Sequence, residues 1–83
     1  MSQRKKSKEE RFMEKIYEFA GASGDPENEV DRYKVGASVG ENPKGTDHTV
    51  QRLAKINFIK KSGDKLIYLT QAGLTFVANN ISD

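Results

Sequence analysis

The chain has no cysteine among its 83 residues. Without a thiol it can form no disulfide, and it offers no thiolate ligand for a metal. No apolar run approaches the roughly 20 residues that a membrane-spanning helix needs. The charged N-terminus also lacks the apolar segment of a secretory signal. From these absences we expect a cytoplasmic protein with no membrane partner.

Apolar residues are also scarce, at 35% of the chain. A chain of this length is expected to form one domain with a small hydrophobic core. Cores of this size usually need help from dimerisation, a ligand or very tight packing.

Arrangements of residues that carry catalysis are missing as well. The sequence shows no nucleophile–base pair, no carboxylate dyad and no glycine loop that would cradle a phosphate. His48 is the single histidine, and Asp47 beside it does not complete a metal-ligand set. We therefore expect a protein that is not an enzyme, with no metal site and no cofactor.

What the chain does contain is charge in alternating blocks. Formal side-chain charges sum to +3 over residues 1–11, −4 over residues 12–43 and +4 over residues 44–65. Two basic blocks of this kind suit a polyanionic partner. Solvated surface lysines produce the same pattern, so charge alone leaves both interpretations open.

Apolar spacing predicts the order helix, short strand, helix, helix, strand, strand, helix. Residues 1–7 are polar without periodicity and are expected to form a basic arm, followed by one domain over residues 8–83. The expected elements are a helix over 8–21, an extended piece at 28–30, a helix between 31 and 40, a helix over 43–56, strands at 58–62 and 65–69, and a helix after Thr70.

Residues at the element ends support these boundaries. Ser7, Asp31 and Asn42 are suitable N-caps, and Pro43 follows Asn42 at the first helical position. Asn57 is expected to end the third helix in the left-handed conformation. The pair Gly63-Asp64 predicts a two-residue type II′ hairpin turn.

Several short motifs, in this order, resemble the winged helix-turn-helix superfamily. Val35-Gly36 to Val39-Gly40 resembles the first helix of the helix-turn-helix, Gly40-Glu41-Asn42-Pro43 its tight turn, Leu53-Ala54-Lys55-Ile56-Asn57-Phe58-Ile59 the step from recognition helix to wing, and Leu69-Thr70-Gln71-Ala72-Gly73 the segment after the wing in MarR-type and PadR-type regulators. The resemblance implies an α+β winged helix-turn-helix fold that binds DNA through its third helix.

The third helix carries side chains suited to this role. If Thr46, Val50 and Leu53 face the core, the opposite face presents Lys44, Asp47, His48, Gln51, Arg52 and Lys55. Arginine pairs with guanine edges, glutamine with adenine edges and lysine with phosphates. Any exposed helix face is polar, however, so the face alone does not decide the function.

Two further basic groups flank this helix in the sequence. The expected hairpin carries Lys60, Lys61 and Lys65, and the arm carries Arg4, Lys5, Lys6 and Lys8. Both groups suit phosphate or minor-groove contacts. Edge strands also carry lysine to prevent aggregation, and the arm can equally be a solubilising tail.

The last helix suggests a contact between copies of the chain. With Leu74 and Val77 facing the core, Phe76 is expected to point outward, beside Gly73 and Asn80. An exposed phenylalanine can be incidental, but it can also seat the helix of a second copy. We expect a homodimer, which would support the small core and match two-fold DNA half-sites.

Together these features favour a prokaryotic double-stranded DNA-binding protein, associated with the nucleoid. It would be a transcriptional regulator or a small architectural protein. The alternative is a winged helix used as a protein-interaction module, in which the acidic residues 25–31 would face a basic partner.

Overall fold

A computed structural model describes residues 6–81 of the chain, with side chains through residue 79. Within these residues four helices and a three-stranded antiparallel sheet form an α+β fold. The elements are α1 (Lys8–Ala22), β1 (Val30–Asp31), α2 (Arg32–Ser38), α3 (Pro43–Lys55), β2 (Ile59–Ser62), β3 (Leu66–Leu69) and α4 (Gln71–Ile81). Their order is the order that the sequence predicts.

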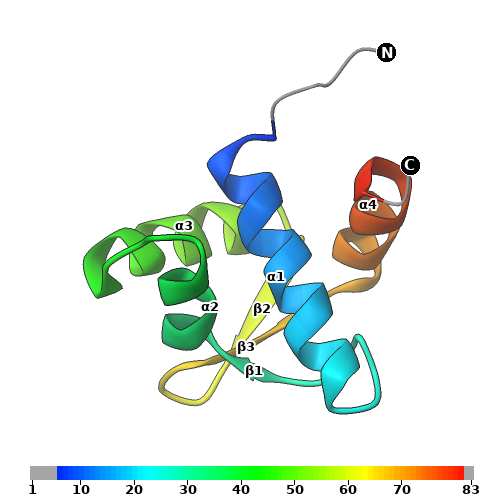
Figure 1. The fold of residues 1–83 in the computed structure, drawn as a ribbon, viewed down its shortest axis with the longest axis horizontal. Coiled ribbons are helices and arrows are strands. Elements are labelled where there is room, and N and C mark those ends of the chain that lie inside the picture. The colour runs from blue at the N-terminus through cyan, green and yellow to red at the C-terminus, as the bar shows by residue number, and fades with distance from the viewer. Residues whose placement is uncertain (1–5, 82–83) are drawn as a thin grey trace.

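Helix α1 crosses the sheet (Figure 1). Helices α2 and α3 lie on one side of α1, and α4 lies on the other side of α1. The strands lie in the order β1–β3–β2, and Ile67 of β3 is paired with Val30 of β1. Phe12 and Ile16 of α1 and Ile67 are fully buried. The core therefore lies where the apolar face of α1 meets the central strand.

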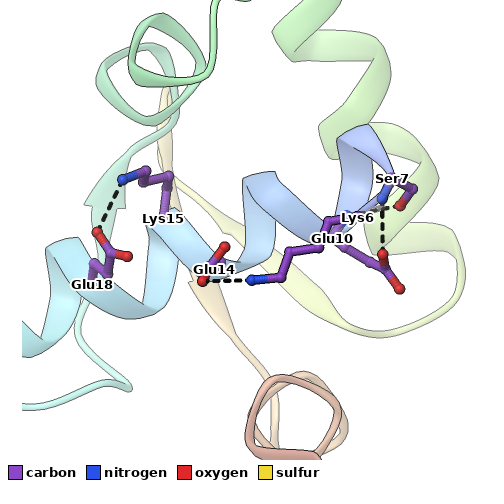
Figure 2. A network of polar contacts seen from close by, with 6 residues as sticks. All are labelled: Lys6, Ser7, Glu10, Glu14, Lys15 and Glu18. Carbon is purple, nitrogen blue, oxygen red and sulfur yellow. Dashed lines mark hydrogen bonds and ion pairs between the residues drawn. The ribbon is translucent and has the colours of Figure 1, made fainter. Parts of the chain in front are cut away.

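The start of α1 is fixed by a capping box (Figure 2). The Glu10 backbone N donates to Ser7 Oγ over 3.1 Å, and the Ser7 backbone N donates to Glu10 Oε1 over 2.8 Å. The polar side of the helix carries two ion pairs, Lys6–Glu14 at 3.0 Å and Lys15–Glu18 at 3.1 Å. Lys6, which the sequence assigns to the arm, is thus bound to α1.

Helices α2 and α3 approach each other closely at Gly36. A Cβ atom on Gly36 would lie 1.9 Å from Thr46 Oγ1, so only glycine fits this position. Gly36 is thus the small residue that lets the two helices approach. Thr46 Oγ1 is buried in the contact and has no hydrogen-bond partner among the described residues.

The predicted caps of α2 and α3 are also confirmed. Asp31 Oδ1 accepts a hydrogen bond from the Tyr33 backbone N over 2.9 Å. Asn42 Oδ1 accepts one from the Gly45 backbone N over 2.7 Å. Asn57 has a φ of 66° and ends α3 in the left-handed conformation.

The prediction of a two-residue hairpin turn is wrong. Ser62 pairs with Leu66, so the loop between β2 and β3 contains three residues, 63–65. On the other side of β3, the Arg32 backbone N and Nε both donate to the Lys65 carbonyl, over 2.9 and 3.2 Å, in the same register as the β1–β3 pairs. Lys65 thus belongs to the loop with respect to β2, while its carbonyl is bound at the start of α2.

Val77 faces the core as predicted, but the prediction that Phe76 points outward from α4 is wrong. Gly73 and Val77 are buried, and Phe76 is half-buried with its ring 5.0 Å from that of Phe58. A Cβ atom on Gly73 would lie 2.1 Å from the Phe58 carbonyl oxygen. Phe76 thus packs against its own chain where α4 approaches the Phe58 backbone closely. Gly73 is buried and offers little surface to a second copy, and the Asn80 side chain lies outside the described part.

Candidate nucleic-acid interface

Helix α3 has one buried face and one exposed face. Thr46, Thr49, Val50 and Leu53 are buried against the rest of the domain. Five of the six residues predicted to read DNA are exposed on what we call the outer face: Lys44, His48, Gln51, Arg52 and Lys55. The prediction that Thr46, Val50 and Leu53 face the core is confirmed, so the outer face is free of core-forming side chains.

Four of these side chains share one shallow hollow. His48, Gln51, Arg52 and Lys55 line a depression of about 200 Å³ along α3. Their spacing of three and four residues places them on neighbouring turns of the helix. The hollow brings together an imidazole, an amide, a guanidinium and an ammonium group, all of which donate hydrogen bonds to phosphate oxygens or base edges.

Asp47 differs from its neighbours because it is held by α2. Its Oδ1 accepts a hydrogen bond from the Tyr33 hydroxyl over 2.8 Å and lies 3.5 Å from Arg32 Nη1. The bond to Asp47 raises the pKa of Tyr33 above its ordinary value. Asp47 thus links α3 to α2 in addition to its predicted place on the outer face.

Two ion pairs tie the start of α1 to α3 and to the turn before it. Arg52 Nη1 pairs with Glu9 Oε2, and Lys8 Nζ lies 2.9 Å from Glu41 Oε2. The Glu41 side chain is only 8% exposed and also accepts a hydrogen bond from Thr49 Oγ1. The hydrogen bond from Lys8 holds the pKa of Glu41 below its ordinary value, against the effect of burial.

Sequence reasoning missed both contacts. Glu9 stands in the first turn of α1, where its position is explained by the helix dipole alone. The residues of each pair are 43 and 33 positions apart in the chain, so no local spacing predicts that they meet. Glu41 offers one sequence signal for the second pair. It is a charged residue directly after Gly40, in a turn that leads into buried residues, so it needs a partner.

The three hairpin lysines do not form one cluster. Lys60 and Lys61 are consecutive in β2 and therefore leave opposite faces of the sheet. Lys65 Nζ lies 3.5 Å from Asp31 Oδ2, on the side of β1. Burial alone would raise the pKa of Asp31, but the hydrogen bond from the Tyr33 backbone and the charge of Lys65 lower it.

The remaining predicted residues belong to the arm. Arg4 and Lys5 lie outside the described residues, and Lys6 is paired with Glu14. Among residues 6–81, no group of three or more histidine, aspartate or glutamate side chains is placed to hold a metal ion. In the same part of the chain no helix is long and apolar enough to cross a bilayer.

No protein-family model, curated protein or solved structure matches this chain.

Proposed function

We propose that this chain is a winged helix-turn-helix protein that binds double-stranded DNA and acts as a transcriptional regulator or architectural protein. Helix α3 enters the major groove with its outer face toward the bases, and the β2–β3 hairpin is the wing. The single observation that carries the proposal is the hollow on α3, where His48, Gln51, Arg52 and Lys55 are exposed together. A major groove admits one helix of this width.

The packing of α3 supports this role. The close contact at Gly36 and the bonds of Asp47 to α2 fix the helix at its N-terminal half. A rigid helix loses little conformational entropy when it binds. Lys44 and Lys55 on α3, and Lys60 and Lys61 on β2, are exposed and form no ion pair with another described residue. These ammonium groups are available to phosphates.

The alternative function, a protein-interaction module, has less support. It relies on the acidic residues 25–31 facing a basic partner. Glu29 accepts a hydrogen bond from Ser62 Oγ over 2.7 Å, and Asp31 is used by Tyr33 and Lys65. These carboxylates serve contacts within the chain.

The test is a titration of a random-sequence duplex with the full chain at several salt concentrations. Fluorescence anisotropy of the duplex measures the binding. Each phosphate contact contributes about −0.9 to the slope of log K on log salt, so Lys44, Lys55 and one of the two β2 lysines give a slope of about −2.7. Lys55→Gln should make the slope shallower by about 1. Lys15→Gln is the matched control, because Lys15 is already paired with Glu18 on α1. Absence of binding at low salt, or equal slopes for the two variants, contradicts the proposal.

Base recognition is tested separately. Gln51→Ala should reduce the preference for a selected site over random duplex by about tenfold, because one bidentate base contact is worth about 1–3 kcal/mol. Lys61→Ala should weaken both duplexes equally. If Gln51→Ala also weakens both duplexes equally, the outer face binds only the DNA backbone.

The homodimer remains a prediction. With Gly73 buried and Phe76 packed on Phe58, its support is the small core and the two-fold symmetry of DNA half-sites. Sedimentation equilibrium of the chain, alone and with a palindromic duplex, measures it. A chain that stays monomeric in both states contradicts the prediction.

A further inference from the structure

An apolar pocket of about 440 Å³ opens between the first turns of α1, the end of α3 and α4. Its apolar wall consists of Met13, Leu53, Ile56, Phe58 and Phe76. Ile56 is 56% exposed there, the most exposed of the large hydrophobic side chains in the described part. The volume falls within the roughly 300–1,000 Å³ typical of small-molecule sites, which combine an apolar wall with a few polar groups.

The polar rim of the pocket contains two cations that can bind an anion. It is formed by Ser7, Glu9 and Glu10 of the α1 start and by Arg52 and Lys55 of α3. Both acids already accept hydrogen bonds, Glu10 from the Ser7 backbone and Glu9 from Arg52. Lys55 forms no ion pair with another described residue, and Arg52 contributes only Nη1 to Glu9. Lys55 and Arg52 therefore keep unused hydrogen-bond donors at the rim.

We propose that this pocket binds a small amphipathic anion, with an apolar body and one carboxylate or sulfonate group. The apolar body lies against Ile56, Phe58 and Phe76 and covers surface that no described residue covers. The anionic group accepts hydrogen bonds from Lys55 and from the unused donors of Arg52. Charge-assisted bonds of this kind are about twice as strong as neutral ones, so the rim selects for the anion.

The same two cations line the hollow on the outer face of α3. A bound anion that engages Arg52 and Lys55 withdraws them from DNA phosphates. Ligand and DNA therefore oppose each other, and each lowers the affinity of the other by the same factor. This consequence rests on the proposed function, whereas binding to the pocket does not.

Binding is measured without DNA. Anilinonaphthalene sulfonate is the probe, because it is an amphipathic anion whose fluorescence rises in an apolar site. It should bind the folded chain at one site and be displaced by decanoate below its micelle concentration. Decanol has the same chain length without the charge and should compete about tenfold less well.

Two matched pairs of variants locate the site. Ile56→Ser should weaken probe binding about fivefold by removing part of the apolar wall. Tyr17→Ser removes the other strongly exposed hydrophobic side chain, which lies on α1 outside the pocket lining, and should change nothing. Lys55→Gln should weaken decanoate about tenfold and leave decanol unchanged, whereas Lys60→Gln on β2 should affect neither.

Several results would overturn the proposal. Equal probe binding by Ile56→Ser and Tyr17→Ser would place the site elsewhere. Equal competition by decanoate and decanol would show that the pocket does not select for an anionic group. Sedimentation that shows a dimer broken by Ile56→Ser, with no displacement of the probe by decanoate, would assign the pocket to a second copy. Displacement by decanoate in a chain that binds no DNA would leave the pocket standing and reject only the proposed function.

Discussion

The two halves of α3 are held in different ways. The N-terminal half packs against α2 without space, because Gly36 lets the helices meet at Thr46. The C-terminal half faces α1 across the apolar pocket and is linked to it by the Arg52–Glu9 pair, in which the Arg52 side chain is 70% exposed. The first half sets the direction of the helix, and the second leaves its cations able to exchange partners. A binding helix needs both properties.

The largest expected effect comes from closing the space at Gly36. Gly36→Ala places a Cβ atom 1.9 Å from Thr46 Oγ1 in a buried contact, so we expect a loss of about 3 kcal/mol in the free energy of unfolding. Chemical denaturation measures it. Gly21→Ala on α1 is the control, since no atom lies within 4 Å of its Cβ position, and it should be neutral or slightly stabilising.

Removing the clashing atom should restore part of the loss. In the double variant Gly36→Ala/Thr46→Ala the Oγ1 atom is gone, so the double variant should be more stable than the sum of the two single losses predicts. Additive losses would show that Gly36 matters for another reason.

A smaller effect of opposite sign is expected at Thr46 itself. Its Oγ1 is buried without a hydrogen-bond partner among the described residues, and valine has the same shape without the polar atom. Thr46→Val should therefore raise the free energy of unfolding by about 1 kcal/mol. Thr75→Val on the exposed side of α4 should stay within about 0.5 kcal/mol of the parent. Destabilisation by Thr46→Val would mean that the hydroxyl is satisfied, for example by a buried water.

Some of these structural features could be predicted from the sequence, and others could not. Element order and helix caps follow from local patterns, and Ser7, Asp31 and Asn42 act as expected. The pairing of the Lys65 carbonyl and the packing of Phe76 involve contacts between distant segments. Arg32 holds Lys65, and Gly73 meets the Phe58 backbone. Period and propensity contain no information about such contacts.

The candidate site divides in the same way. The outer face of α3 could be predicted because helical periodicity separates it from the buried residues Thr46, Val50 and Leu53. The pairing of Arg52 with Glu9 and the apolar pocket beneath it could not be predicted. Both depend on the angle at which α1 crosses α3, and that angle is decided by packing.

The contribution of the Lys8–Glu41 ion pair to stability should depend on pH. The Lys8 hydrogen bond lowers the pKa of Glu41 in the folded chain, so its stabilising effect is present above the unfolded pKa, near 4.3. It is lost as the pH falls through the lower folded value. Glu41→Gln should cost about 1 kcal/mol at pH 7, and the difference from the parent should shrink at low pH. A constant difference across the acid range would exclude a contribution from the Glu41 charge.

The Glu9–Arg52 ion pair, at the C-terminal half of α3, should affect DNA binding more than stability. Glu9 and Arg52 are linked on the surface, where such pairs contribute about 0.2–1 kcal/mol. Glu9→Gln should therefore leave the free energy of unfolding within about 0.5 kcal/mol of the parent, while it frees the Arg52 guanidinium on the outer face of α3.

Because one more cation then meets phosphate, duplex affinity should rise and the slope of log K on log salt should steepen by about 1. Anisotropy titrations at several salt concentrations measure both quantities. Glu18→Gln removes an acid of α1 that is paired with Lys15, far along the helix from α3, and controls for the change in net charge. If Glu18→Gln steepens the slope as much as Glu9→Gln does, total charge explains the gain. If only Glu9→Gln does so, α1 restrains the DNA-binding face through Arg52.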